Sequence, residues 1–222
     1  MKPSNPTVLK NIILFAVFFS VCYCFSQTKN KTVYVKYITE PITVDAILDE
    51  NVWSTAKPAT NFWQYFPKNS TQATQQAEIK MLFDDDNLYI GMKINSSGND
   101  YIIPSFRRDY SFRGNDNITL VLDTFSDGTN AFLFGSNPYG VQREMLLSGG
   151  GANPRRDFNM AWDTKWINAS KIHEKYYILE WAIPLSSFKY REGETKWLFS
   201  SYHLDTKSNE TITWINVPEN QF

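Results

Sequence analysis

Cysteine and histidine are scarce in this chain of 222 residues. There are 2 cysteines, Cys22 and Cys24, and both lie within the first 26 residues. The 2 histidines, His173 and His203, are too few and too far apart for a zinc motif. The rest of the chain contains no cysteine and so no disulfide, so packing, alone or with a metal ion, must stabilise it.

An excess of charge and a catalytic constellation are also missing. The formal net charge of -1 at pH 7 gives no reason to expect nucleic acid or an anionic membrane surface as the partner. No Ser-His-Asp or Cys-His set is visible in the sequence. Glu174 and Glu180 would lie roughly 20 Å apart on one expected strand, beyond the roughly 5 to 10 Å of a glycosidase acid pair. The sequence therefore gives no positive signal for catalysis.

The apolar run near the start of the chain is short. It covers residues 12–19, follows a lysine-containing start and precedes a short polar exit at Ser26. This pattern predicts a secretory signal peptide over residues 1–26, with no membrane span in the mature domain. The expected location is the periplasm, the outer membrane or the outside of the cell. The alternative is a lipoprotein signal, with Cys22 or Cys24 acylated.

Aromatic residues and alternating patterns are what the chain has in quantity. Aromatics make up 16% of residues, which favours an all-β core or a surface that stacks on flat ligands. In residues 78–95 (EIKMLFDDDNLYIGMKIN), apolar residues alternate on both sides of an Asp-Asp-Asp-Asn turn. This predicts a β-hairpin with one apolar row on each strand. Leu82 interrupts the outward polar row, so we expect that face to be partly covered.

Short strands at regular spacing predict the fold class. Further strands are expected over residues 31–38, 42–48, 61–66, 117–123, 130–135, 141–147, 162–168, 175–183, 196–204 and 211–217. With hardly any helical periodicity, this pattern predicts an all-β antiparallel sandwich, jelly-roll or immunoglobulin-like, over residues 31–222.

The two ends of the expected sandwich carry further signals. One short helix is expected near residues 49–56, with Asp49 as its N-cap and Trp53 as its apolar anchor. The chain ends at Phe222, directly after an expected strand. That ending suits the leading domain of a longer protein or a truncated reading frame.

Two tryptophans form the first candidate binding site. Trp162 and Trp166 are four residues apart, so on a strand they would share a face and form a platform, with Asp163 beside them. Sugar rings stack on indoles, and carboxylates accept hydrogen bonds from hydroxyl groups. The alternative is that the tryptophans fill the core, because Trp is highly buried on average.

Arginines in long loops form the second candidate site. Arg107, Arg108 and Asp109 make one Arg-Arg-Asp triplet, Arg113 follows in the same loop, and residues 155–157 repeat the triplet. A guanidinium fork can hold two vicinal hydroxyls or a uronic carboxylate. The alternative is that these charges pair within the chain and pin the loops.

The acidic turn is the first candidate metal site, and Asp123 with Asp127 is a second candidate set for calcium. Asp84, Asp85 and Asp86 have the oxygen ligands that calcium prefers, so calcium is the one candidate cofactor. Their spacing does not match an EF-hand loop, and short Asx side chains favour turns by themselves. A solvated turn is therefore the first interpretation.

Four stretches, in the same order, resemble the family 9 carbohydrate-binding modules. Residues 42–53 (ITVDAILDENVW) look like the first motif of that family, with Ala46 where Gly is usual. Residues 85–90 (DDNLYI), 116–123 (DNITLVLD) and 180–184 (EWAIP) look like its central hairpin, its Asp-to-Asp strand and its Glu-x-x-Ile-Pro segment.

The resemblance covers roughly residues 37–222 and implies a β-sandwich that binds sugar chains between tryptophans, with calcium sites in some members. The family is usually attached to secreted glycoside hydrolases such as xylanases, so xylan or a cellulose-like chain is the implied partner. Family members commonly have Trp three residues before the position of Asp116 and Glu three residues after it. This chain has Arg113 and Thr119 there.

Three functional hypotheses follow. The first is an exported carbohydrate-binding domain, associated with polysaccharide breakdown or capture, that performs no chemistry itself. The second is a non-catalytic structural or interaction domain that leads a larger outer-membrane protein, because the Arg-Arg-Asp and Trp-Asp-x-x-Trp segments resemble that branch of exported bacterial proteins. The third is a fragment of a secreted glycoside hydrolase whose catalytic region is missing.

Overall fold

The computed structural model describes residues 31–217, except 69–70 and 154. The compact unit within it begins at Thr32. The predicted signal peptide, residues 1–26, lies outside the described residues. Among the helices of the described residues, none has the length and apolarity needed to cross a bilayer.

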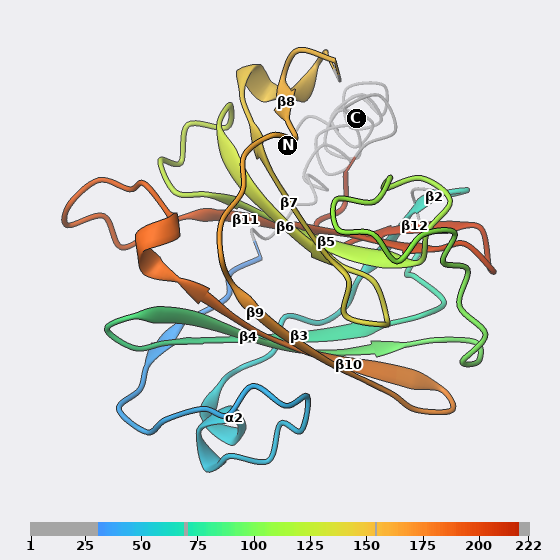
Figure 1. Cartoon of the computed structure of the whole chain (residues 1–222), viewed down its shortest axis with the longest axis horizontal. Coiled ribbons are helices and arrows are strands. Elements are labelled where there is room, and N and C mark those ends of the chain that lie inside the picture. Colours follow the sequence, from blue (N-terminus) through green and yellow to red (C-terminus); the bar gives the residue numbers. More distant parts are fainter. Residues whose placement is uncertain (1–30, 69–70, 154, 218–222) are drawn as a thin grey trace, which may run out of the picture. The chain divides into compact units, whose positions relative to one another are not determined.

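Two stacked sheets form the domain (Figure 1). The five-stranded sheet has the order β1 (Lys36–Tyr37), β3 (Ala77–Phe83), β4 (Asn87–Asn95), β10 (Tyr176–Pro184) and β9 (Ile167–Ile172). The seven-stranded sheet has the order β2 (Trp63–Phe66), β12 (Glu210–Thr213), β11 (Leu198–Asp205), β5 (Asn117–Asp123), β6 (Ala131–Ser136), β7 (Gln142–Leu147) and β8 (Phe158–Asn159).

Neighbouring strands run antiparallel in both sheets, except for the pair β1–β3, which is parallel. In the part of the chain that the structure describes, the helical elements are α2 (Asn51–Thr55) and the two 3-10 turns η2 (Gly149–Gly151) and η3 (Leu185–Ser187). The predicted all-β antiparallel sandwich with one short helix is therefore confirmed.

The hairpin β3–β4 forms the middle of the five-stranded sheet, as the alternation predicted. Its register pairs Ile79 with Met92 and Met81 with Ile90, and all four side chains are buried in the core between the sheets. The opposite wall of this core includes Ile118, Leu120 and Phe134 of β5 and β6. Each such side chain contributes about 1.5–3 kcal/mol by leaving water.

A second apolar cluster covers part of the outer face of the five-stranded sheet, where α2 lies (Figure 1). Leu82 is fully buried there against Trp53 and Tyr89, so the predicted covering of this face is confirmed. Trp53 anchors the helix, as its apolar position indicated. The N-cap is Glu50 rather than Asp49, and it makes no side-chain capping hydrogen bond.

The carboxylate of Glu180 holds the segment before α2 in place. It accepts hydrogen bonds from the backbone N–H groups of Asp45 (3.0 Å) and Ala46 (2.8 Å) and from Trp53 Nε1 (3.2 Å). Burial raises the pKa of Glu180 to about 7, against the lowering effect of these bonds. Ala46 has a φ of 63°, in the left-handed region, which explains why glycine is usual at this position of the motif.

Two predicted strands are wrong, and a third is much shorter than expected. Residues 42–48 form no strand, because this segment lies over the outer face and gives N–H groups to side chains, including Thr43 N–H to Glu50 Oε1 (2.8 Å). Residues 162–166 are irregular, and β9 begins at Ile167. The strand expected over residues 31–38 is reduced to β1.

Candidate functional site

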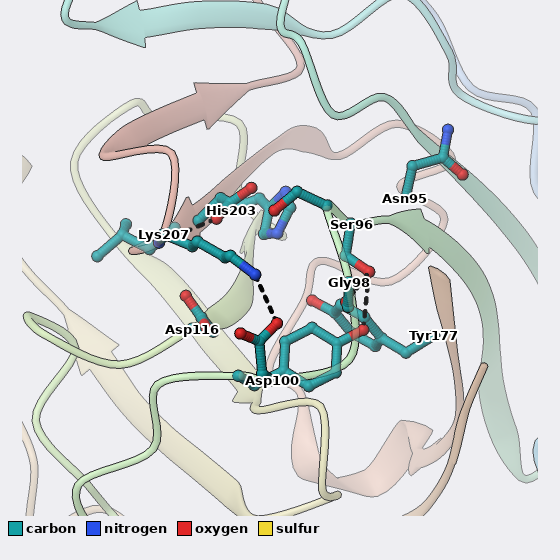
Figure 2. A pocket seen from close by; sticks show the side chains of 12 residues that line it. Asn95, Ser96, Gly98, Asp100, Asp116, Tyr177, His203 and Lys207 are labelled. Atoms are coloured by element: carbon teal, nitrogen blue, oxygen red, sulfur yellow. Dashed lines mark hydrogen bonds and ion pairs between the residues drawn. The ribbon is translucent and has the colours of Figure 1, made fainter. Parts of the chain in front are cut away.

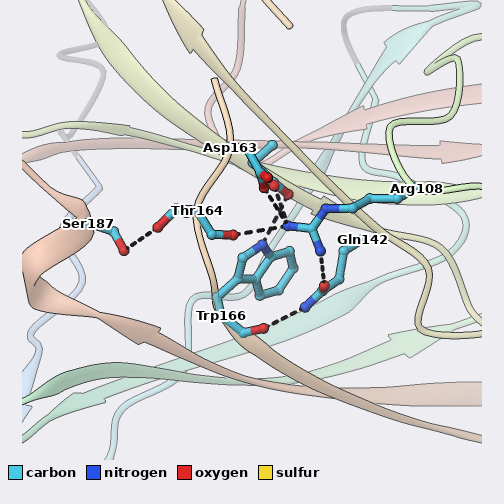
Figure 3. Close-up of polar contacts among 7 residues, drawn as sticks. Arg108, Gln142, Asp163, Thr164, Trp166 and Ser187 are labelled. Atoms are coloured by element: carbon cyan, nitrogen blue, oxygen red, sulfur yellow. Dashed lines mark hydrogen bonds and ion pairs between the residues drawn. The ribbon is translucent and has the colours of Figure 1, made fainter. Parts of the chain in front are cut away.

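Three of the sequence-predicted residues, Arg108, Asp163 and Trp166, meet in one polar network (Figure 3). Arg108 Nη1 donates to Gln142 Oε1 at 2.5 Å. Arg108 Nη2 donates to Asp163 Oδ1 (3.3 Å), to the carbonyl of Thr164 (3.0 Å) and to Glu144 Oε1. The second carboxylate oxygen of Glu144 accepts a hydrogen bond from Trp166 Nε1 at 3.1 Å.

This network ties the loop of Arg108 to β7 and to the segment before β9. Both terminal nitrogens of Arg108 are engaged, and the Glu144 carboxylate that they hold is almost fully buried. The prediction that the Arg108 fork is free for sugar hydroxyls is therefore wrong. Arg108 follows the alternative interpretation, in which loop arginines pair within the chain, although its partners lie on other elements rather than in its own triplet.

The predicted tryptophan platform is also wrong, because neither tryptophan lies on a strand. Trp166 is 6% exposed and packs against Trp181 (5.0 Å between ring centroids) and Phe134 (5.5 Å). Trp162 is half-buried and meets Phe134 (5.8 Å) and Phe132 (5.4 Å) edge-on. Both indoles extend the core, and the Glu144 carboxylate satisfies the one polar atom that Trp166 takes out of water.

The other predicted arginine-loop residues are exposed. Asp109 has a φ of 58° and donates its backbone N–H to the carbonyl of Gln142 at 3.1 Å, which fastens the loop to β7. Arg107 and Arg113 lie at the surface, and the ion pairs of the described residues include neither. The side chains of both arginines face solvent.

The acidic turn uses its oxygens for its own backbone. Asp84 Oδ1 accepts the N–H groups of Asp86 (2.9 Å) and Asn87 (2.7 Å), and Oδ2 accepts the hydroxyl of Tyr89 (2.9 Å). Burial opposes the shift, but these hydrogen bonds hold the pKa of Asp84 below its usual range. Asp85 accepts the Tyr37 hydroxyl at 3.1 Å. In the described part of the chain, no three His, Cys, Asp or Glu side chains are grouped to hold a metal ion.

Sequence reasoning missed a buried arginine on the outer face of the seven-stranded sheet. Arg143 of β7 lies in a row with Gly135 of β6 and Thr119 of β5, and it donates from Nη2 to Thr119 Oγ1 at 2.7 Å. Its guanidinium lies 5.0 Å from the ring centroid of Phe112 and 5.4 Å from that of Tyr110. We call this group of residues the arginine corner.

The positive charge of Arg143 is buried, and no ion pair of the described residues neutralises it. Arg143 is 3% exposed, its Nε has no hydrogen-bond partner, and the ion pairs of the described residues do not include it. Burial lowers the pKa of Arg143, although Tyr110 and Asp109 act in the opposite direction. Gly135 is required here, because a Cβ would lie 2.8 Å from Thr119 Oγ1. The available signal was the outward position of Arg143 in the alternation of β7.

A small polar pocket lies between β10 and β11 (Figure 2). Asp116 accepts the N–H groups of Ile102 and Thr206, each at 2.6 Å, and the ion pair between Lys207 and Asp100 measures 2.6 Å. The cavity volume is about 10 Å³, the space of one water molecule rather than of a sugar.

Several buried polar atoms around this pocket have no hydrogen-bond partner among the described residues: Tyr177 Oη, His203 Nδ1, Asp205 Oδ2 and Thr206 Oγ1. Burial lowers the pKa of His203, although Asp205, Asp116 and Glu210 act in the opposite direction. This pocket therefore favours a neutral imidazole.

A larger groove lies on the outer face of the five-stranded sheet, and we call it the outer groove. Its volume is about 310 Å³. Residues 46–49 form one wall, Gly91 and Ile178 lie on its floor, and Lys93 and Lys171 line it. A Cβ on Gly91 would lie 2.9 Å from Leu48 Cδ2, so glycine lets the wall sit directly on the sheet.

Solved structures with the same fold bind sugars. Two structures of a carbohydrate binding module family 9 from Caldicellulosiruptor kristjanssonii are similar, one in complex with cellotriose and one with glucose. The cellotriose complex has a TM-score of 0.53 and 17% identity, over 82% of both chains. The glucose complex has a TM-score of 0.54 and 16% identity, over 82% of this chain and 84% of that one.

A structure of an inferred carbohydrate-binding protein from Bacteroides uniformis is also similar, with a TM-score of 0.56 and 12% identity, over 82% of this chain and 89% of that one. At these identities the likeness establishes the fold. A comparison with curated proteins gave no match. The model of a family described as carbohydrate family 9 binding domain-like matches residues 44–222, which is most of the chain. The chain therefore belongs to the carbohydrate family 9 binding domain-like family.

Proposed function

We propose that this domain binds neutral carbohydrate at the arginine corner, on the outer face of the seven-stranded sheet. The observation that carries the proposal is Arg143, a buried guanidinium whose Nε has no hydrogen-bond partner and which forms no ion pair among the described residues. It hydrogen-bonds Thr119, which stands where family members commonly have Glu, and it contacts Phe112, the neighbour of the position where they commonly have Trp.

A bound sugar would supply a hydrogen-bond acceptor for Arg143 Nε, which has no partner among the described residues. A buried donor without a partner costs about 1–3 kcal/mol, and a sugar hydroxyl accepting from Nε would remove that cost. The ring of Phe112 is half-buried, and Arg113 beside it is exposed. The C–H face of a pyranose can pack on such a ring while Arg113 donates to hydroxyls at the rim. Because Nε lies beneath the surface, the segment of Phe112 must move outward to admit the sugar.

Cello-oligosaccharides and xylan fragments are the ligands that we propose. The solved structures of this fold hold cellotriose and glucose, which are neutral sugars. We also propose that the protein is exported and serves in polysaccharide capture or breakdown, on the strength of the signal-like pattern of residues 1–26.

A second candidate function is an interaction domain that leads a larger envelope protein. The observations that favour it are the replacement of the family's Trp and Glu by Arg113 and Thr119, and the burial of Trp166 in the core. Such a domain would retain the β-sandwich fold but would not bind sugar.

Calorimetry on the full chain tests the proposal. Cellotriose and xylotriose are titrated into the wild type and into Phe112→Ala, Arg113→Ala and the control Arg107→Ala, an exposed arginine in the same loop. We expect saturable binding in the wild type and the control, a loss of about tenfold or more in Phe112→Ala, and unchanged melting temperatures. A wild type that binds neither sugar would support the interaction domain instead.

A further inference from the structure

The outer groove lies on the opposite outer face of the sandwich from the arginine corner, so it is a separate site. Its volume of about 310 Å³ falls within the range of small-molecule pockets, roughly 300–1,000 Å³, and suits a disaccharide unit. Four elements contribute to it: β3, β4, β9 and β10, with the segment of residues 46–49 as a wall.

Two lysines flank an apolar position across this sheet. In the register, Ile178 of β10 is directly opposite Lys93 of β4 on one side and Lys171 of β9 on the other. Directly paired residues point to the same face, and strands are spaced about 4.8 Å apart. The two lysine backbones therefore lie about 10 Å apart, with the side chain of Ile178 between them.

Neither ammonium group has a carboxylate partner in the part of the chain that the structure describes. The ion pairs of the described residues include neither Lys93 nor Lys171. Glu78 faces Lys93 from β3, on the side away from Ile178, and Asp49 lies on the wall, but neither makes an ion pair in the described residues. An ammonium group has three donors and no acceptor, so the space above Ile178 favours a ligand that brings acceptor oxygens and negative charge.

The aromatic side chain next to the lysines is already occupied. The imidazole of His173 stacks on Tyr176 with 4.3 Å between ring centroids and 17° between planes, and Lys93 Nζ lies 4.7 Å from the Tyr176 centroid. The usual sugar-stacking surface is therefore not free here. His173 also lines the groove, and its Nε2 is buried and has no hydrogen-bond partner among the described residues.

We propose that the outer groove is a second carbohydrate site, specific for saccharides that contain uronic acid. The sugar carboxylate lies between Lys93 and Lys171, the C–H face of its ring packs on Ile178, and a hydroxyl meets His173. Charge, rather than stacking on an aromatic ring, selects the ligand. A neutral glucan leaves both ammonium groups without a counter-ion and gains little here.

The test uses trigalacturonate as the anionic probe and cellotriose as the neutral one, titrated into the full chain by calorimetry. We expect trigalacturonate to bind, Lys93→Gln and Lys171→Gln to weaken it about two- to fivefold each, and the double variant about tenfold. The control is Lys189→Gln, an exposed lysine outside the groove, which should bind like the wild type. Raising the salt concentration should weaken binding further, because the charges are exposed.

Two outcomes would overturn the proposal. One is a wild type that does not bind trigalacturonate, or binds it equally well after both lysines are replaced. The other is competition by acetate at an equal carboxylate concentration, which would show a site for anions rather than for sugars. Phe112→Ala separates this proposal from the first site: it should weaken cellotriose and leave trigalacturonate unchanged. If cellotriose does not bind at the arginine corner, the trigalacturonate result at the outer groove can therefore still be interpreted, and the reverse also holds.

Discussion

Trp166 Nε1 donates a 3.1 Å hydrogen bond to the Glu144 carboxylate, which places an indole that looked like a sugar platform inside the core. Truncation should therefore affect folding rather than binding. We expect Trp166→Ala to lower the free energy of unfolding by about 3–5 kcal/mol, because a large buried aromatic leaves a cavity. Urea denaturation measures this, and Trp166→Phe should cost less. A loss below about 1 kcal/mol would place the indole in solvent after all.

Replacing Arg108 measures how much its positive charge stabilises the buried Glu144 carboxylate. Arg108→Met leaves a buried carboxylate that retains the Trp166 bond but loses its cation, and we expect a cost of about 1–3 kcal/mol. The double variant Arg108→Met with Glu144→Gln should recover part of that loss, because the buried charge is gone. A double-mutant cycle by urea denaturation measures the coupling. Additive losses would mean that the two side chains do not interact.

Glu180 should make the domain less stable as the pH rises from about 4.5 to about 7. Burial raises the pKa of Glu180 in the folded state to about 7, whereas the unfolded chain has an ordinary value. Between these two values the folded state binds more protons, so its stability decreases with increasing pH. Glu180→Gln should flatten this part of the stability curve. If the wild type and the variant give parallel curves, Glu180 does not titrate in this range.

His203 should remain neutral through the range in which an exposed histidine gains its proton. Burial lowers the pKa of His203, so the unfolded chain binds the proton first and stability decreases as the pH drops below about 6.5. Nuclear magnetic resonance of the imidazole carbons reports the midpoint directly. A midpoint at or above about 6.5 would contradict the burial argument.

The sequence predicted the secondary structure best where the residues of a single strand determine it. Alternation placed β3, β4 and β5 within a residue of their bounds, because one buried face fixes a period of two. The same alternation predicted a strand over residues 42–48, and that prediction is wrong. The N–H groups of Asp45 and Ala46 bond Glu180, a residue far along the chain that no local pattern reveals.

The site residues were harder to predict than the strands, because a loop sequence does not show the partners of its side chains. The arginine loop was identified, but Arg108 is occupied by Gln142 and Glu144 of β7. The outer groove depends on Lys93 and Lys171, which come from strands that meet only through β10. The sheet register, rather than any sequence spacing, brings them together.

Binding of neutral sugar at the arginine corner is tested most directly by the Nε–H resonance of Arg143. Cellotriose is titrated into the ¹⁵N-labelled full chain, and the Arg143→Lys variant assigns the signal. We expect a saturable shift of Arg143 Nε–H together with the amides of Phe112 and Thr119, and no matching shift at Lys171. Saturable shifts elsewhere that leave Arg143, Phe112 and Thr119 unmoved, or no shifts at all, would contradict it.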